Sequence, residues 1–330
     1  MTNPKSLLIP TESDYIDAHG DTKPEEQFRE TWNKLRLEKD ANGNYKYPWD
    51  FEVVQGFFKQ SDDSTDDRVF NYALDHMGRL KSWKEIVSDL EKLNSEAPDN
   101  VEYKLLILAR HGEGWHNRVV NKHGLEAWDN KYHALTTDGE ITYAPDPELT
   151  DIGIKQAQEN RDLWKKEIEL GAPIPSKFFV SPLQRSSNTL VITWQDLKPK
   201  DKQPIVVEKI RETIGKNLCD KRSSKTIIDQ RFGKYGFKTD GIVEEDIYFG
   251  DERESMTHQS MRINEFLQDL FESDCKNGKV DKNLAKENIA ISTTSHAGTI
   301  RCFINVLNHR KFTISTGGMI PIVCRGTRRQ

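Results

Sequence analysis

Several features that mark secreted, membrane-bound and metal-binding proteins are scarce or absent in this 330-residue sequence. The few cysteines lie far apart and form no Cys-x-x-Cys pair, so the sequence indicates neither a zinc site nor a redox motif. Such cysteines are typical of reduced thiols in a cytosolic protein. We therefore expect no metal ion and no cofactor. The cysteines are Cys219, Cys275, Cys302 and Cys324.

Long apolar runs and an excess of positive charge are also missing. No apolar run approaches the roughly 20 residues of a membrane span. Residues 1–10 contain only three consecutive apolar residues, too few for the core of a signal peptide. Charged residues are plentiful but mixed in sign, and the net charge of −5 does not favour a nucleic-acid partner. We expect a cytoplasmic protein, with a nuclear location as the alternative, that binds neither membranes nor nucleic acids.

One short apolar run leads directly into reactive side chains. The run Leu105–Ala109 is followed at once by Arg110 and His111. A continuous apolar run of this length predicts a buried strand of a parallel sheet. Reactive groups in open α/β sheets lie just beyond the carboxyl ends of the strands. There, a histidine can act as a nucleophile and a neighbouring arginine can bind an anion.

From residue 105 onward, predicted strands alternate with predicted helices. The strands are 105–109, 178–180, 204–207, 289–293 and 321–324, and helices follow near 151, 190, 256 and 299. This order predicts an α/β fold, a three-layer sandwich with a mostly parallel central sheet and helices on both faces. We divide the chain into an N-terminal extension, 1–100, packed on a main domain, 101–330, which carries polar insertions near 112–148 and 213–254.

The extension and the C-terminus carry weaker signals. Residues 1 to about 45 are polar and weakly periodic, which predicts an arm that lies on the domain or is partly mobile. Residues 51–58 alternate loosely and predict a strand. A helix is predicted over 82–93, because Ser82 and Glu85 form a capping box. We expect a solvated tail at the C-terminus, containing Arg325, Arg328 and Arg329.

Polar residues with catalytic potential follow four of the predicted strands. Each of them alone is more often a structural or solvated residue, but sequence-distant strand ends meet at one edge of such a sheet. Two arginines and two histidines there form a pocket for a compact anion such as phosphate, and a carboxyl group can protonate a leaving oxygen. The amide of Ala297 could add an anion contact at a helix N-terminus. The residues are Arg110, His111, Arg185, Glu212 and His296.

Five segments carry a resemblance to a known family. They are Leu108–Asn117, which contains Arg110-His111-Gly112-Glu113, then Leu149–Ala157, Ser181–Thr189, Arg211-Glu212 and Ser295–Gly298. In their order and rough spacing, these segments resemble the histidine phosphatase superfamily, the phosphoglycerate-mutase-like proteins, from about residue 105 to the C-terminus. More narrowly, the chain is similar to the fungal phosphomutase-like phosphatases, through Phe57–Asp62, Ser82-Trp83, Leu93-Asn94, Gly114–Asn117 and Cys219–Ser223.

The resemblance implies a role for each matching residue. His111 would carry a phosphoryl group transiently, Arg110, Arg185 and His296 would bind that group, and Asn117 would contact it from the following loop. Glu212 would donate and accept the proton, with Glu113 and Glu208 as alternatives nearby in the sequence. Asp220, Lys221 and Arg222 would shape the substrate mouth, or form a solvated charge cluster.

Three functions are consistent with this pattern. The first is a phosphomonoesterase that acts through phosphohistidine on small metabolites such as sugar, nucleotide or thiamin phosphates. The second is a phosphomutase of the same family, and the third is a noncatalytic phospho-ligand-binding protein. The intact set of Arg110, His111, Arg185, Glu212 and His296 disfavours the third. We expect aromatic residues of the insertions, such as Trp128 and Tyr143, to line the mouth.

Overall fold

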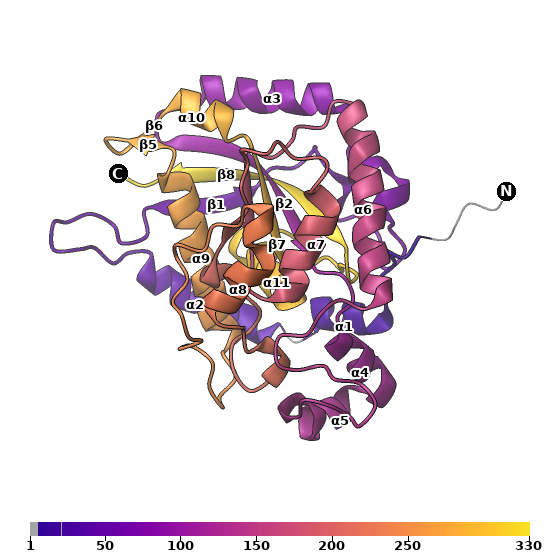
Figure 1. Ribbon diagram of the computed structural model, residues 1–330. Coiled ribbons are helices and arrows are strands. Elements are labelled where there is room, and N and C mark those ends of the chain that lie inside the picture. Colours follow the sequence, from indigo (N-terminus) through magenta and orange to yellow (C-terminus); the bar gives the residue numbers. More distant parts are fainter. Residues whose placement is uncertain (1–5, 21) are drawn as a thin grey trace.

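The computed structural model describes residues 6–20 and 22–330. Its centre is a six-stranded sheet in the order β1-β8-β2-β7-β3-β4 (Figure 1). Strands β2, β7, β3 and β4 run parallel, and β8 pairs antiparallel with both β1 and β2. The sheet is therefore mostly parallel, as predicted. The strands are β1 (Trp49–Val53), β2 (Val101–Arg110), β3 (Lys177–Val180), β4 (Ile205–Val206), β7 (Ala290–Ser295) and β8 (Met319–Arg328).

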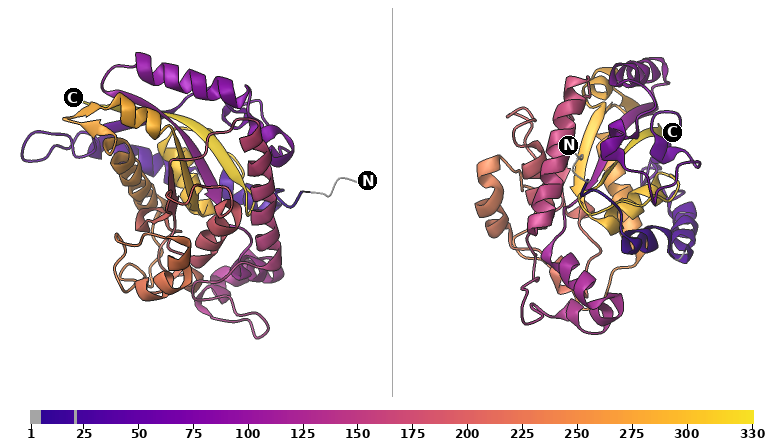
Figure 2. Two further views of the ribbon diagram at one scale, coloured as in Figure 1. Left: turned by 45° about the horizontal axis from the view of Figure 1, so that its top comes forward. Right: turned by 90° about the vertical axis from the view of Figure 1, so that its right-hand side faces the viewer.

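Helices cover both faces of this sheet (Figure 2). On one face, Leu105 and Ile107 pack into a core shared with α3 (Trp83–Glu96), α6 (Asp151–Glu169) and α7 (Gln184–Trp194). On the other face, Leu106 and Leu108 pack against α2 (Lys23–Leu35), α9 (Met256–Glu272) and α11 (Ala297–Val306). Each fully buried leucine stabilises the fold by about 1.5–3 kcal/mol. Alternate residues of β2 thus join the two outer layers.

The smaller elements lie around this sandwich. Helix α3 begins at the capping box of Ser82 and Glu85, which confirms that prediction. The helices are α1 (Glu12–His19), α4 (Trp115–His123), α5 (Leu125–Asn130), α8 (Lys225–Phe232) and α10 (Lys282–Glu287), and a hairpin joins β5 (Cys275–Lys276) to β6 (Lys279–Val280). The 3₁₀ turns are Lys59–Ser61, Tyr72–Leu74, His76–Gly78, Tyr132–Ala134, Glu208–Ile210, Leu218–Asp220 and Gly233–Tyr235.

The N-terminal segment wraps around the sandwich and is more ordered than its weak periodicity predicted. Ser6 Oγ and the amide of Leu7 both donate to the Glu159 carboxylate on α6, at 2.5 and 2.9 Å. The chain then forms α1 and α2, which cross near α11 and α9, and enters the sheet as the edge strand β1 (Figure 1). The extension therefore supplies one strand of the central sheet.

Two further expectations were wrong. Trp128 and Tyr143, from the insertion that contains α4 and α5, are 5% and 1% exposed in a small core of their own rather than at a mouth. The C-terminal arginines are not a solvated tail, because residues 319–328 form β8. Arg328 pairs with Glu272 at 3.0 Å, and Arg329 donates to the carbonyl oxygens of Arg36 and Tyr47.

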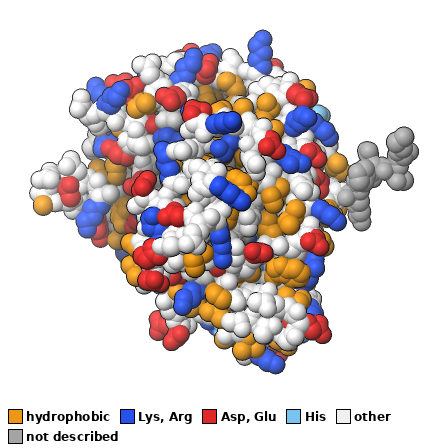
Figure 3. All heavy atoms as spheres, viewed as in Figure 1, with side chains coloured by type: hydrophobic (Ala, Val, Ile, Leu, Met, Phe, Trp, Pro, Cys, Tyr) orange, Lys and Arg blue, Asp and Glu red, His pale blue; other side chains and the backbone are white. Residues whose placement is uncertain are grey.

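The surface is mixed in charge. On the face drawn in Figure 3, acidic and basic side chains are interspersed among small apolar areas. Within the described residues, no helix combines the length and the apolar character needed to cross a membrane.

Candidate active site

The candidate site lies at the carboxyl ends of β2, β7 and β3. Arg110 is the last residue of β2, and His296 follows β7 as the N-cap of α11. The amide of His111 donates to the carbonyl oxygen of Ser295 at 3.0 Å, which holds the ends of β2 and β7 together. Arg185 lies in the first turn of α7, just after β3. The structure therefore brings together four of the residues predicted to meet.

His111 presents one ring nitrogen to the interior of the site. Its Nδ1 lies 2.7 Å from the carbonyl oxygen of Gly112, so Nδ1 carries the proton and donates to that oxygen. Nε2 then keeps its lone pair, and Arg185 Nε donates to it at 3.3 Å. The His296 ring lies 5.0 Å from the His111 ring, centroid to centroid. His111 Nε2 thus faces a guanidinium group.

Electrostatics keep the imidazoles of this site neutral. Burial and the positive charge of Arg185, followed by His116 and Arg110, hold the pKa of His111 well below its usual range. The pKa values of His116 and His296 are lowered in the same direction, again mainly by burial and by Arg185. His111 is therefore deprotonated, and able to attack, at pH values where a free imidazole is protonated.

Both arginines of the site are anchored from one side. Arg185 donates through Nη1 to the carbonyl oxygen of Cys219 at 3.0 Å and through Nη2 to Asp220 Oδ1 at 2.8 Å. Arg110 donates through Nη1 to Asp14 Oδ1 at 2.6 Å and to the carbonyl oxygen of Ile314 at 2.7 Å. Such anchoring fixes a guanidinium group while leaving part of it to bind an anion.

Three buried nitrogens around His111 make no hydrogen bond with the described residues. They are Arg110 Nε, His116 Nδ1 and His296 Nδ1. His296 is held by its other nitrogen, with Nε2 2.7 Å from Ser181 Oγ. Buried polar atoms are normally paired, and an unpaired one calls for an explanation such as a bound ligand, an ion or an ordered water. We name Arg110, His111, His116, Arg185 and His296 the histidine cluster.

Glu212 lies beside this cluster at the start of α11. Its Oε1 accepts a hydrogen bond from the Thr213 amide at 2.8 Å. The same oxygen lies so close to Gly298 that a Cβ added there would be 2.6 Å from it, so a larger residue at 298 would displace the Glu212 carboxyl group. Burial, followed by the negative charge of Asp220, raises the pKa of Glu212. A half-buried carboxyl group with a raised pKa is suited to donate a proton.

The two alternative carboxyl groups are engaged elsewhere. Glu113 accepts hydrogen bonds from Thr150 Oγ1 at 2.6 Å and from Arg118 Nη2 at 3.0 Å. Glu208 pairs with Arg211 at 3.2 Å and with Arg222 at 2.5 Å. Of the three candidates, Glu212 is thus the one without an arginine partner among the described residues.

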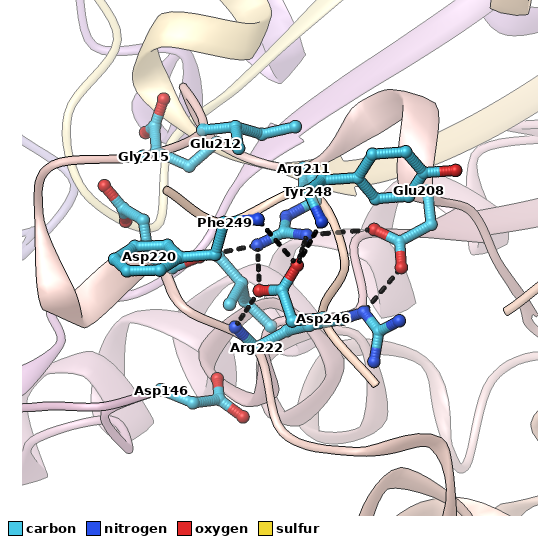
Figure 4. A network of polar contacts seen from close by, with 12 residues as sticks. Asp146, Glu208, Arg211, Glu212, Gly215, Asp220, Arg222, Asp246, Tyr248 and Phe249 are labelled. Carbon is cyan, nitrogen blue, oxygen red and sulfur yellow. Dashed lines mark hydrogen bonds and ion pairs between the residues drawn. The ribbon is translucent and has the colours of Figure 1, made fainter. Parts of the chain in front are cut away.

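A second group of buried charges is drawn in Figure 4. Asp220 links it to the histidine cluster, because its carboxylate accepts from Arg185 Nη2 and its carbonyl oxygen accepts from Arg211 Nη2, both at 2.8 Å. Asp246, from the second insertion, binds Arg211 Nη1 and Nη2 with both carboxylate oxygens, at 2.8 and 2.7 Å. Arg222 uses all of its side-chain nitrogens, on Glu208 and on carbonyl oxygens of residues 223, 243, 244 and 245. We name Glu208, Arg211, Arg222 and Asp246 the arginine network; it fixes residues 213–254 onto the domain.

The remaining predicted site residues lie at the rim. Asn117 is half-buried on α4, and its Oδ1 accepts a hydrogen bond from the Gly114 amide at 2.9 Å. Ala297 is half-buried as the first residue of α11. Lys221 is exposed, with its Nζ 5.8 Å from the centroid of the Phe249 ring. Within the described residues, no group of three or more His, Cys, Asp or Glu is arranged to hold a metal ion.

Sequence reasoning gave no role to several residues of the site. His116 lies 5.6 Å from His111 between ring centroids, and it was visible only as part of the Gly-Trp-His-Asn run. Arg253 pairs with Asp220 at 2.9 Å beside Arg185. Asp14 comes from the arm before the sheet. No local pattern marks these residues, because each reaches the site through the tertiary fold.

The chain is similar to several known proteins. The chain is 32% identical over 295 residues to a probable phosphoglycerate mutase of Arthroderma benhamiae, covering 83% of this chain and 84% of that protein. It is 33% identical over 277 residues to phosphomutase-like protein 3 of Candida albicans, covering 83% and 79%. A mycobacterial glucosyl-3-phosphoglycerate phosphatase structure aligns over 63% of this chain and 81% of its own, with a TM-score of 0.35 and 18% identity.

A family model also matches residues 106–316, a stretch that contains the histidine cluster and Glu212. The description of that model is histidine phosphatase superfamily, branch 1. Together with the fungal relatives, this match shows that the chain belongs to the histidine phosphatase superfamily.

Proposed function

We propose that this protein is a phosphoric monoester hydrolase that acts on small phosphorylated metabolites through a phosphohistidine on His111. The observation that carries the proposal is the environment of His111 Nε2. This nitrogen keeps its lone pair because Nδ1 donates to Gly112, and it faces the Arg185 guanidinium at 3.3 Å. A nucleophile next to a fixed cation is what transfer of an anionic phosphoryl group requires.

In the first half-reaction, His111 Nε2 attacks phosphorus and the ester P–O bond breaks. Arg110, Arg185 and the Ala297 amide at the start of α11 stabilise the charge on the phosphoryl oxygens. Asn117 contacts the group from α4. Glu212 gives its proton to the leaving oxygen, so the alcohol departs neutral.

In the second half-reaction, the oxygen of a water molecule attacks phosphorus, and the Glu212 carboxylate takes a proton from that water molecule. The Nε2–P bond breaks, inorganic phosphate leaves, and both His111 and Glu212 return to their starting protonation states.

Lys221, exposed at the rim, is placed to attract the substrate. We assign Arg222 to holding the insertion, because all of its side-chain nitrogens already bind protein oxygens.

The experiment is a phosphate-release screen over sugar, nucleotide, thiamin and aryl phosphates. The wild-type protein should release phosphate, and His111→Ala should not. His133→Ala serves as the matched control, because His133 is a half-buried histidine of the first insertion that lies outside the histidine cluster. Equal activity in wild type and His111→Ala would contradict the mechanism.

A mutase is the second candidate, because one of the similar fungal proteins carries the name probable phosphoglycerate mutase. A mutase and a phosphatase differ in whether an alcohol or water takes the phosphoryl group from His111. Phosphorus NMR of the reaction mixture separates them, since a mutase yields an isomeric ester before inorganic phosphate.

All four cysteines are free, and we propose that the protein works in a reducing compartment such as the cytosol.

A further inference from the structure

The N-terminal helix α1 reaches the phosphoryl-binding arginine. Asp14 Oδ1 lies 2.6 Å from Arg110 Nη1, and both side chains are 9% exposed. The other oxygen of Asp14 accepts hydrogen bonds from the Thr11 amide and from Thr11 Oγ1, at 2.8 and 2.7 Å. The capping box of α1 thus holds the Asp14 carboxylate in place, and this carboxylate in turn holds the guanidinium group of Arg110.

A second acceptor holds the same nitrogen. Arg110 Nη1 also donates to the carbonyl oxygen of Ile314, in the segment that precedes β8. With Nη1 occupied twice, the guanidinium group cannot turn about its long side chain. Its Nε makes no hydrogen bond with the described residues, although it is buried. The anchoring therefore commits one edge of Arg110 to the protein and leaves the Nε edge for an anion.

Asp67 connects helix α1, which carries Asp14, to the segment that carries Ile314. Asp67 Oδ2 lies 2.7 Å from His19 Nε2 at the end of α1. The same oxygen accepts hydrogen bonds from the Thr313 amide and Thr313 Oγ1, at 2.7 and 2.6 Å. Helix α1 and the segment that carries Ile314 are thereby joined at Asp67. The N-terminal extension is built into the support of the site.

We propose that Asp14 is a positioning residue for the phosphoryl group, acting through Arg110. This inference rests on the proposed function, and it gives the N-terminal extension a part in the reaction. Asp14 orients the guanidinium group before the substrate arrives, so that the Nε edge meets the phosphoryl oxygens without a search among side-chain rotamers. The negative charge of Asp14 also compensates the positive charge of Arg110, whose burial costs free energy.

The test compares Asp14→Asn with Asp17→Asn. Asp17 lies on the same helix, but its side chain is exposed, so its variant controls for a change in α1 itself. Binding of orthovanadate and of inorganic phosphate is measured by calorimetry, which needs no turnover. Asp14→Asn should weaken binding about tenfold, the size usual for a residue that orients a ligand-binding group, and Asp17→Asn should leave binding unchanged.

A double-mutant cycle separates this role from a merely structural one. If Asp14 acts through Arg110, then Arg110→Gln and Arg110→Gln/Asp14→Asn should bind vanadate equally weakly. A further tenfold loss in the double variant would overturn the proposal, as would tighter binding by Asp14→Asn, which would make Asp14 a competitor of phosphate. If wild type binds phosphate but hydrolyses no ester, the proposed function fails while the cycle still tests the role of Asp14.

Discussion

Arg185 and Arg222 are both buried and lie near each other, yet the protein uses them differently. Arg222 directs each side-chain nitrogen to a carboxylate or carbonyl oxygen. Arg185 is anchored through Nη1 and Nη2 only, and it turns Nε toward the imidazole of His111. A guanidinium group closed on all sides supports the fold, whereas one anchored from behind can bind a reacting anion.

The same distinction separates the two groups of charges. The arginine network pairs two arginines with two carboxylates, contains no imidazole, and has one buried nitrogen, Arg211 Nε, without a partner among the described residues. The histidine cluster holds three imidazoles whose pKa values are lowered, and three of its nitrogens have no partner among the described residues. The comparison teaches that balanced charges alone do not identify an anion-binding site. The site is identified by the direction in which the side-chain hydrogen-bond donors point.

Matched substitutions in the two groups should give opposite results. Arg185→Lys keeps the charge but loses the fixed fork of donors, so kcat/KM should fall about 10²–10³-fold. Arg222→Lys should leave kcat/KM within about threefold but lower the free energy of unfolding by roughly 2–3 kcal/mol, because carbonyl groups lose their donors. Steady-state kinetics and urea unfolding of both variants check this. Equal losses of kcat/KM in the two variants would contradict the distinction between Arg185 and Arg222.

Glu212→Gln tests the proton donor between the two groups. Glutamine keeps the size and polarity of the side chain but cannot act as an acid. In the first turnover, release of an alkyl alcohol should slow about 10²–10³-fold, and release of an activated aryl alcohol less than about tenfold, since its leaving group needs little protonation. Burst-phase rates of alcohol release for both substrate types decide the matter, because the later attack of water on phosphohistidine is common to both. An equal loss on both would move the acid role to Glu113 or Glu208.

The pH profile should be bell-shaped with an acidic optimum. His111, whose pKa is lowered, stays neutral into the acid range, and activity is lost only when it becomes protonated. Glu212, whose pKa is raised, keeps its proton to higher pH than a free carboxyl group, and activity is lost as that proton leaves. The limits belong to the coupled set of groups.

Asp220→Asn sharpens this prediction. The negative charge of Asp220 raises the pKa of Glu212, so removing it should lower that pKa and move the alkaline limb toward acid pH. The profile of kcat/KM for wild type and variant measures the shift, with the exposed Asp129→Asn on α5 as the control. An alkaline limb that stays in place would show that Asp220 does not act on the proton donor.

The smallest expected effect is that of a chelator. Arg110 and Arg185 supply the positive charge that a metal ion supplies in other phosphatases. Activity should therefore remain within about twofold after treatment with EDTA, while vanadate should inhibit by imitating the transferring group. Loss of activity on EDTA treatment, restored by Mg²⁺ or Zn²⁺, would contradict the sequence expectation of a metal-free site.

Local patterns predicted the parts of the fold that local forces determine. The capping box at Ser82 and the apolar run of β2 depend on neighbours in the sequence, and both lie where they were expected. The convergence of Arg110, His111, Arg185 and His296 was predictable because parallel strands share one carboxyl edge. The order of strands and helices was sufficient for that inference.

The rest depends on partners that are distant in the sequence. Strand β8 lies between β1 and β2 in a register that sets Val53 against Cys324, and no periodicity within 319–328 reveals that pairing. Arg328 was expected in solvent because its partner, Glu272, lies on another element. Asp14 reaches Arg110 only because α1 folds back over the edge of the sheet.

The most direct test of the account is detection of the phosphorylated residue. The protein is mixed with a substrate from the screen, quenched within one turnover under alkaline denaturing conditions that preserve phosphohistidine, digested, and sequenced by mass spectrometry. The account predicts one phosphoryl group on His111 in wild type, more of it in Glu212→Gln, where the carboxylate that activates water is lost, and none in His111→Gln. Hydrolysis without any phosphorylated histidine, or a phosphoryl group on another residue, would contradict it.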